Sequence, residues 1–175
     1  MKSEIRNPKS EIRRRGFTLV EVLIVVTIIG IAGAVIVPHM LTTGSLGIQA
    51  AGRMVIADLL YAQNEAIAQQ SPCRVVFDPP NNRYYLTDGA GNVMSTSWKG
   101  DGLGNYVVNF NEDSRFAGVT ISAAEFDDTL IVEFDALGAP TNGGTIDLTA
   151  DGFHYRVSVA DITGRVTIAA VTAGP

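Results

Sequence analysis

Apolar residues form one continuous run near the start of the chain and later recur at regular intervals between polar residues. The run extends from Phe17 to Val37 and contains a single charged residue, Glu21. At a rise of about 1.5 Å per residue, a helix over this run is about 31 Å long, which matches the hydrocarbon thickness of a bilayer. The pattern therefore predicts a membrane-spanning helix at residues 17–38.

The proline that follows this run changes the pattern. Pro38 and the polar stretch at residues 42–45 are predicted to bend or loosen the helix, because proline removes a backbone donor. Helical periodicity then returns within residues 39–70. The apolar residues that recur at steps of three, four or seven are Ile48, Val55, Leu59, Ala62 and Ala66. We expect an amphipathic helix that is covered by a folded domain and ends at Ser71-Pro72.

From Cys73 onward the period is that of β-strands. Eight short β-rich runs are separated by turns rich in Gly, Pro and Asn, and the turn at residues 78–82 predicts a hairpin. The runs lie at residues 74–77, 83–87, 106–110, 119–122, 130–134, 145–149, 154–160 and 165–171. In the fifth run, Leu130, Val132 and Phe134 are predicted to share one face. We therefore expect an α+β fold in which residues 71–175 form an antiparallel β-sandwich that rests on the amphipathic helix.

Charge changes sharply along the chain. A block of arginines at residues 13–15 precedes the apolar run, which predicts a cytoplasmic amino terminus and an exported remainder. Residues 1–16 hold six basic and two acidic residues, so the formal net charge changes from −5 to −9 without them. Nucleic-acid binding depends on Lys and Arg that neutralise phosphates. The acidic remainder therefore argues against nucleic acid as a partner.

The segment Arg15-Gly16-Phe17-Thr18-Leu19-Val20-Glu21 resembles the processing site of type IV prepilins and of the pseudopilins of type II secretion. The resemblance implies that residues 1–16 are a leader, that prepilin peptidase cleaves after Gly16, and that Phe17 becomes N-methylated. It also implies that Glu21 meets the terminal amine of a neighbouring subunit during filament assembly. Such a pair is strongly attractive in a low-dielectric environment. The alternative interpretation is an uncleaved signal anchor.

The remainder of the chain resembles the GspH/FimT family of minor pseudopilins and minor pilins. The resemblance lies in residues 58–67, in Phe134-Asp135-Ala136-Leu137-Gly138, and in the closing segment around Gly164-Arg165-Val166. It implies a pilin-like fold, with Pro38 in the family's usual place, and a single-pass protein of the bacterial inner membrane with its carboxyl-terminal domain in the periplasm. The implied partners are other pseudopilins or pilins, prepilin peptidase and the inner-membrane assembly platform.

The resemblance leaves the function open between related systems. The hypothesis is a structural minor pseudopilin of a type II secretion pseudopilus, which is not an enzyme and helps to assemble the periplasmic filament for protein export. The alternatives are a minor pilin of a type IV pilus, with a role in pilus assembly and DNA uptake, or a membrane-anchored periplasmic binding domain.

The sequence offers little material for catalysis or for cofactor and metal binding. The glycine-rich segment at residues 100–104 lacks the Lys-Ser/Thr ending of a phosphate loop. His39 and His154 are the two histidines, too few for a zinc site built on histidine. The acidic segment at residues 125–128 lacks the spacing of a calcium loop and predicts a solvated turn. The single cysteine, Cys73, is expected to be a buried residue at a strand start. Taken together, these features lead us to expect no cofactor, metal or catalytic residue.

Overall fold

A computed structural model describes residues 16–40, 43–96 and 104–171 of the chain. The chain divides into two compact units, Met1–Leu41 and Thr42–Pro175. The first unit contains helix α1 (Leu19–Met40), which continues through Pro38, so the proline does not end the helix. The bend expected at Pro38 stays a prediction. Within the described part of the chain, no helix combines the length and the apolar content that a bilayer crossing requires.

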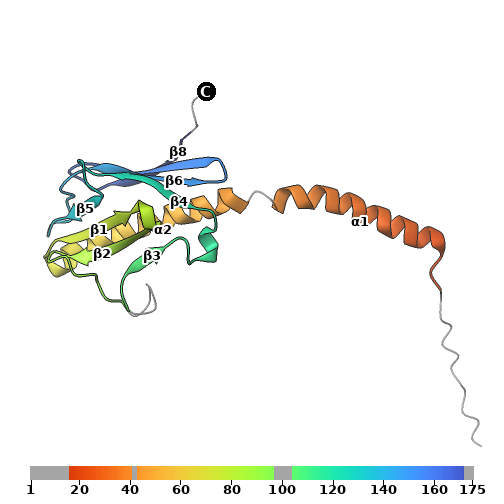
Figure 1. Ribbon diagram of the computed structural model, residues 1–175, viewed down its shortest axis with the longest axis horizontal. Helices are drawn as coiled ribbons and strands as arrows, with labels where there is room; N and C mark the ends of the chain where they lie inside the picture. The colour runs from red at the N-terminus through yellow and green to blue at the C-terminus, as the bar shows by residue number, and fades with distance from the viewer. Residues whose placement is uncertain (1–15, 41–42, 97–103, 172–175) are drawn as a thin grey trace, which may run out of the picture. The chain divides into compact units, whose positions relative to one another are not determined.

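The second unit contains one long helix and two antiparallel four-stranded sheets (Figure 1). The helix is α2 (Thr43–Gln69). The sheet with the order β3-β2-β1-β5 is formed by β1 (Cys73–Asp78), β2 (Arg83–Asp88), β3 (Val107–Asn109) and β5 (Ile131–Phe134). The sheet with the order β4-β6-β7-β8 is formed by β4 (Thr120–Glu125), β6 (Gly144–Ala150), β7 (Phe153–Val159) and β8 (Val166–Ala170). This arrangement confirms the expected pilin-like α+β fold with eight short strands.

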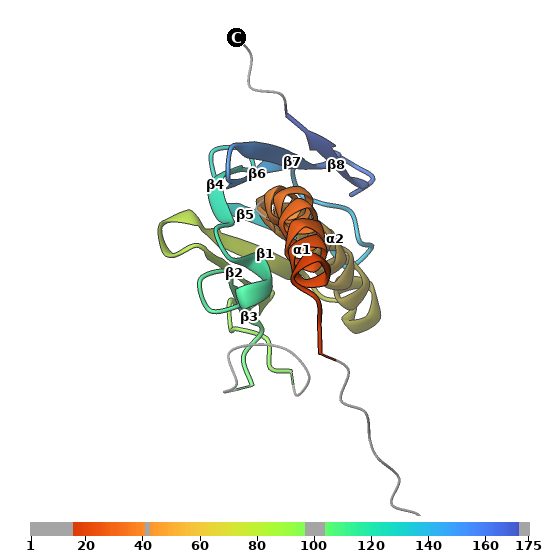
Figure 2. The same cartoon turned by 90° about the vertical axis from the view of Figure 1, so that its right-hand side faces the viewer.

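Helix α2 buries the face that its sequence pattern predicts. The five predicted residues are fully buried and contribute to a single apolar core. The helix contacts β1 and β5 of one sheet and β6, β7 and β8 of the other. Figure 2 shows α2 beneath the sheet that ends in β8. Because full burial of a Leu or Ile side chain contributes roughly 1.5–3 kcal/mol, this face anchors the helix to both sheets.

The carboxyl end of α2 is closed by a Schellman motif. Gln70 adopts a left-handed conformation with φ 48°, and its N–H donates to the carbonyl of Ile67. The N–H of Ser71 reaches back to the carbonyl of Ala66 over 3.2 Å. These two bonds satisfy carbonyls that the helix end would otherwise leave open. The helix thus ends directly before Ser71-Pro72, as predicted.

The predicted hairpin at residues 78–82 joins β1 to β2, and one of its residues also links the two sheets. Asn82 has φ 51° and is buried. Its side-chain oxygen accepts the N–H of Ile121 at 2.9 Å, and its side-chain nitrogen donates to the carbonyl of Val119 at 2.8 Å. This single side chain therefore connects the β1–β2 turn to the start of β4.

Two local expectations are corrected. Val132 and Phe134 are buried on one face as predicted, but Leu130 is 42% exposed because β5 begins only at the following residue. Its carbonyl instead accepts the N–H of Phe77. Within residues 125–128 only the exposed Asp127 and Asp128, both of positive φ, form the predicted solvated turn, because Glu125 ends β4 and Phe126 is fully buried. The glycine-rich segment at residues 100–103 and the side chain of His39 lie outside the described residues.

Candidate functional site

The amino-terminal processing residues lie at the exposed start of the described chain. Gly16 has no other atom within 4 Å of the position that a Cβ would occupy. The side chain of Phe17 is 79% exposed. Helix α1 begins two residues later, at Leu19. The peptide bond between Gly16 and Phe17 therefore precedes the helix.

Thr18 and Glu21 form a capping box at the start of α1. The backbone N–H of Glu21 donates to the hydroxyl of Thr18 at 3.2 Å, and the N–H of Thr18 points to a carboxylate oxygen of Glu21 at 3.5 Å. This reciprocal pair is the Thr-x-x-Glu pattern that satisfies open donors in the first helical turn. The positive end of the helix dipole also favours a carboxylate there. The carboxylate of Glu21 is therefore held toward the end of the chain that cleavage would create.

The surface of α1 is apolar on all sides. All described side chains from Phe17 to Ala32 are exposed, and Glu21 is the charged one among them. An isolated helix with apolar residues all around its axis is stable in the interior of an assembly or in lipid rather than in water. Helix α1 is therefore of the kind that requires an apolar environment around it.

A buried polar cluster connects α2 to the β3-β2-β1-β5 sheet and was not predicted from the sequence. The carboxylate of Asp58 is only 3% exposed and accepts hydrogen bonds from the hydroxyls of Tyr84 at 2.5 Å and Tyr106 at 2.9 Å. Burial and the neighbouring Asp58 raise the pKa of both tyrosines above the ordinary value. The cluster is enclosed, so its geometry suits a structural role.

Cys73 is the first residue of β1 and is buried, as the sequence predicts. Its thiol lies 3.5 Å from the sulfur of Met94, and burial raises its pKa to about 11. It lines an open hollow of about 400 Å³ together with Glu65 and Asp88. Because the thiolate is the reactive form, this cysteine is not suited to nucleophilic chemistry at neutral pH.

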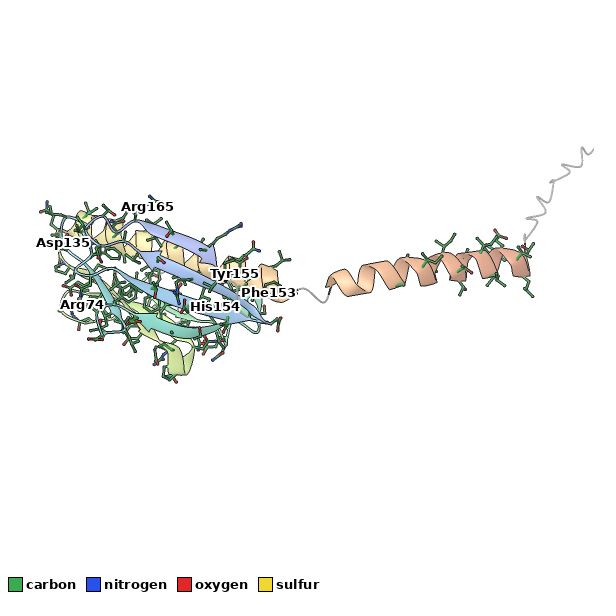
Figure 3. The ribbon with its side chains drawn as sticks, turned by 90° about the horizontal axis from the view of Figure 1, so that it is seen from above. Arg74, Asp135, Phe153, His154, Tyr155 and Arg165 are labelled. Carbon is green, nitrogen blue, oxygen red and sulfur yellow. The ribbon has the colours of Figure 1, made fainter. Side chains whose placement is uncertain are left out.

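The outer face of the β4-β6-β7-β8 sheet carries one charged cluster. Arg156 donates to both carboxylate oxygens of Asp147 at 2.7 and 2.8 Å, which lowers the pKa of that carboxyl. The imidazole of His154 lies 3.6 Å from the same carboxylate. Figure 3 shows His154 near Phe153 and Tyr155, and Asp135 and Arg165 at the opposite end of this unit. Among the described residues, no three His, Cys, Asp or Glu side chains converge as metal ligands.

Comparisons with known proteins agree with both parts of the chain. Residues 12–37 match the sequence model of the prokaryotic N-terminal methylation motif, and residues 51–163 match that of the type II transport protein GspH. Type II secretion system protein H of Xanthomonas campestris pv. campestris is 34% identical over 154 residues, which cover 87% of this chain and 81% of that protein.

Two solved structures have a similar architecture. The minor pseudopilin EpsH of the type 2 secretion system of Vibrio cholerae is 16% identical, with 70% of this chain and 96% of that chain covered and a TM-score of 0.48. The type IV minor pilin FimU of Pseudomonas aeruginosa is 15% identical, with 70% and 87% covered and a TM-score of 0.50. The likeness to FimU is one of fold.

The fold and the amino-terminal motif define a pilin-like protein. Within that class the GspH match covers more than half of the chain, and the match to protein H extends over most of both sequences. The chain belongs to the GspH family of type II transport proteins.

Proposed function

We propose that this chain is a minor pseudopilin, a structural subunit of the periplasmic filament of a type II secretion system. The observation that carries the proposal is the combination, in one chain, of the methylation motif at residues 12–37 with a GspH-like body at residues 51–163. The role is one of assembly with other pseudopilins, and no enzymatic step is assigned to it. A type IV minor pilin is less well supported, because the likeness to FimU is confined to the fold.

In this proposal the two units have different environments. Prepilin peptidase removes residues 1–16 and Phe17 is N-methylated. Residues 17–38 enter the bacterial inner membrane, where lipid and then neighbouring subunits cover the apolar surface of α1, and the inner-membrane assembly platform extracts the helix into the filament. The second unit lies in the periplasm. The exposure of all described side chains from Phe17 to Ala32 supports this division, since water is a poor environment for them.

Glu21 is proposed to pair with the amino terminus of a neighbouring subunit, and Pro38 to bend α1 in the filament. The capping box supports the role of Glu21, because it directs the carboxylate toward the end of the helix where Phe17 lies. An ammonium group arriving there replaces a weak contact with a charge-assisted one. The carboxylate therefore serves the helix start in the free subunit and the contact between subunits in the filament.

The first experiment measures the intact mass of the full chain extracted from membranes of cells that supply prepilin peptidase. We expect the mass of residues 17–175 with one added methyl group. A mass that still includes Met1 would contradict cleavage after Gly16 and, with it, the proposed role as a filament subunit.

The second experiment separates charge from capping at Glu21. Glu21→Gln keeps a side chain that can complete a capping box, whereas Glu21→Ala removes both functions. If the carboxylate pairs with an amine, secretion and filament incorporation fail in both variants, although processing at Gly16 continues. Normal secretion with Glu21→Gln would contradict pairing of the carboxylate with an amine and would leave helix capping as the role of Glu21.

A further inference from the structure

Strand β8 is the last strand of its sheet and has an unpaired edge. Its neighbour on one side is β7, and the described residues provide no strand on the other side (Figure 2). The N–H of Val171 donates to the carbonyl of His154, and the N–H of Ala160 donates to the carbonyl of Arg165. Because hydrogen-bonded pairs alternate along an antiparallel ladder, Thr167 and Ala169 also bond toward β7.

The same alternation assigns the free groups. Val166, Ile168 and Ala170 direct their N–H and C=O groups away from β7, toward the open edge. In the described part of the chain no strand accepts these groups. They form a regular row of donors and acceptors, which is the template that an added β-strand recognises.

The other three edge strands of the unit are each protected. β3 has only three residues. β4 contains a register shift between Ile121 and Ala123 and ends in a glutamate. β5 is followed by a loop that folds back on it, where Thr141 donates to the carbonyl of Glu133 and Pro140 pairs with Phe134. Short length, bulges and covering loops are the usual means by which proteins protect sheet edges.

Among the residues that the structure describes, β8 has none of these protective features. Its sequence, Val-Thr-Ile-Ala-Ala, contains no charged residue and no proline, and its pairing with β7 shows no register shift. The strand is also fixed in place from the inside. The side chain of Ile168 packs onto α2 at Gly52, where the missing Cβ leaves room for it. A partner would therefore meet a preformed edge and would not have to order it.

We propose that the free edge of β8 binds an extended segment of a neighbouring, different subunit of the filament, which adds a strand to the β4-β6-β7-β8 sheet. This inference rests on the proposed function. The row of outward N–H and C=O groups along β8 favours an extended segment as the partner. The small exposed side chains of Thr167 and Ala169 leave room for a strand with small or β-branched side chains. Pairing of β8 with β8 of a second copy would close a two-fold dimer, which cannot continue as a polar filament.

The test uses the full chain in cells that carry a type II secretion apparatus. A photo-crosslinking amino acid is placed at Ala169, beside the free edge, and in a matched chain at Ala123, an exposed alanine on the bulged strand β4. We expect Ala169 to crosslink to an extended segment of another filament subunit, identified by peptide mass spectrometry. Ala123 should give about ten-fold less of that product, since a bulged edge is a poor template.

A second pair of variants addresses the backbone directly. Ala170→Pro removes an N–H that points to the open edge without removing a bond to β7, whereas Ala170→Val keeps that N–H. Ala170→Pro should abolish the crosslink from Ala169, and Ala170→Val should retain it. If Ala170→Pro lowers the amount of protein, Thr167→Lys is used instead, because a lysine on an edge strand also opposes strand addition. Thr167→Val is then the matched control.

The outcomes distinguish this inference from the proposed function. The chain could be processed at Gly16 and copurify with other pseudopilins, yet crosslink equally from Ala169 and Ala123. That result would reject strand addition at β8 but not the proposed function. A β8–β8 crosslink between two copies, or a crosslink that survives Ala170→Pro and Thr167→Lys, also rejects it. A chain that is neither processed nor associated with other subunits rejects the proposed function itself.

Discussion

The hydroxyl of Tyr84 lies 2.5 Å from a carboxylate oxygen of Asp58, and this contact joins α2 to the β3-β2-β1-β5 sheet. The second carboxylate oxygen accepts the hydroxyl of Tyr106 at 2.9 Å. All three side chains are buried. Because a buried carboxylate is tolerated only where donors satisfy it, these tyrosines fix both the position and the orientation of α2.

Removal of one donor from this cluster is expected to destabilise the protein. Tyr84→Phe removes a hydrogen-bond donor from a buried carboxylate, which costs about 2 kcal/mol. Chemical unfolding of the full chain in detergent, followed by aromatic circular dichroism, measures the loss. Tyr85→Phe is the control, because Tyr85 lies on the opposite face of the same strand and is only half-buried. Similar losses in both variants would contradict a specific role for the Asp58 cluster.

Alkaline pH is expected to weaken the same cluster. Burial, together with the charge of Asp58, raises the pKa of Tyr84 and Tyr106 above that of an unfolded tyrosine. The folded state therefore holds protons that the unfolded state releases, so the stability is complete below about pH 10 and falls as the pH rises further. Unfolding free energies from about pH 8 to about pH 11 should show this decrease. The decrease should be smaller in Tyr84→Phe, and an identical pH dependence would exclude Tyr84 as a source.

Gly144, at the start of β6, is expected to tolerate no side chain. A Cβ there would collide with the backbone carbonyl of Glu125 and with the ring of Phe126, neither of which can move freely. Gly144→Ala should cost about 3 kcal/mol, the upper range for overpacking. Gly47→Ala is the matched control, since its Cβ would meet its nearest atom at 3.6 Å. Alanine favours helix over glycine by up to about 1 kcal/mol, so thermal unfolding should shift in opposite directions in the two variants.

Patterns that reflect burial were readable from the sequence. Alternation along each strand is visible because one side faces the core, as in β1, where buried and half-buried residues alternate from Cys73 to Asp78. The apolar face of α2 was predicted for the same reason. Leu130 was misplaced because periodicity does not mark where a strand begins, and positive φ angles at Asp127 and Asp128 delay the start of β5.

Contacts between polar residues far apart in the chain were not readable. Asp58 falls on the covered face of α2, but its partners follow 26 and 48 residues later. A carboxylate at such a position would ordinarily be assigned to solvent, and no local pattern reveals the two tyrosines that enclose it. The link from Asn82 to Val119 and Ile121 was missed for the same reason. At the amino terminus, in contrast, the local spacing of Thr18 and Glu21 carries the geometry of the capping box.

Cys73 is expected to react slowly in the folded protein. Its thiol is buried, and its pKa is raised to about 11, so the thiolate is scarce at neutral pH. Alkylation with iodoacetamide near neutral pH should be at least about 100-fold slower in the native chain than in denaturant. Mass spectrometry of labelled protein over time gives both rates. Comparable rates would show that the start of β1 opens readily.

Thr18 is expected to stabilise the first turn of α1. Thr18→Val keeps the shape of the side chain but removes the hydroxyl that accepts the N–H of Glu21, at a cost of about 1 kcal/mol. Amide hydrogen exchange of the full chain in detergent should therefore be about five-fold faster in that turn. Thr27→Val is the control, because the hydroxyl of Thr27 bonds to the carbonyl of Leu23 within the helix and does not contact its start. Equal acceleration in both variants would mean that the first turn depends on the general stability of α1 rather than on the pairing of Thr18 with Glu21.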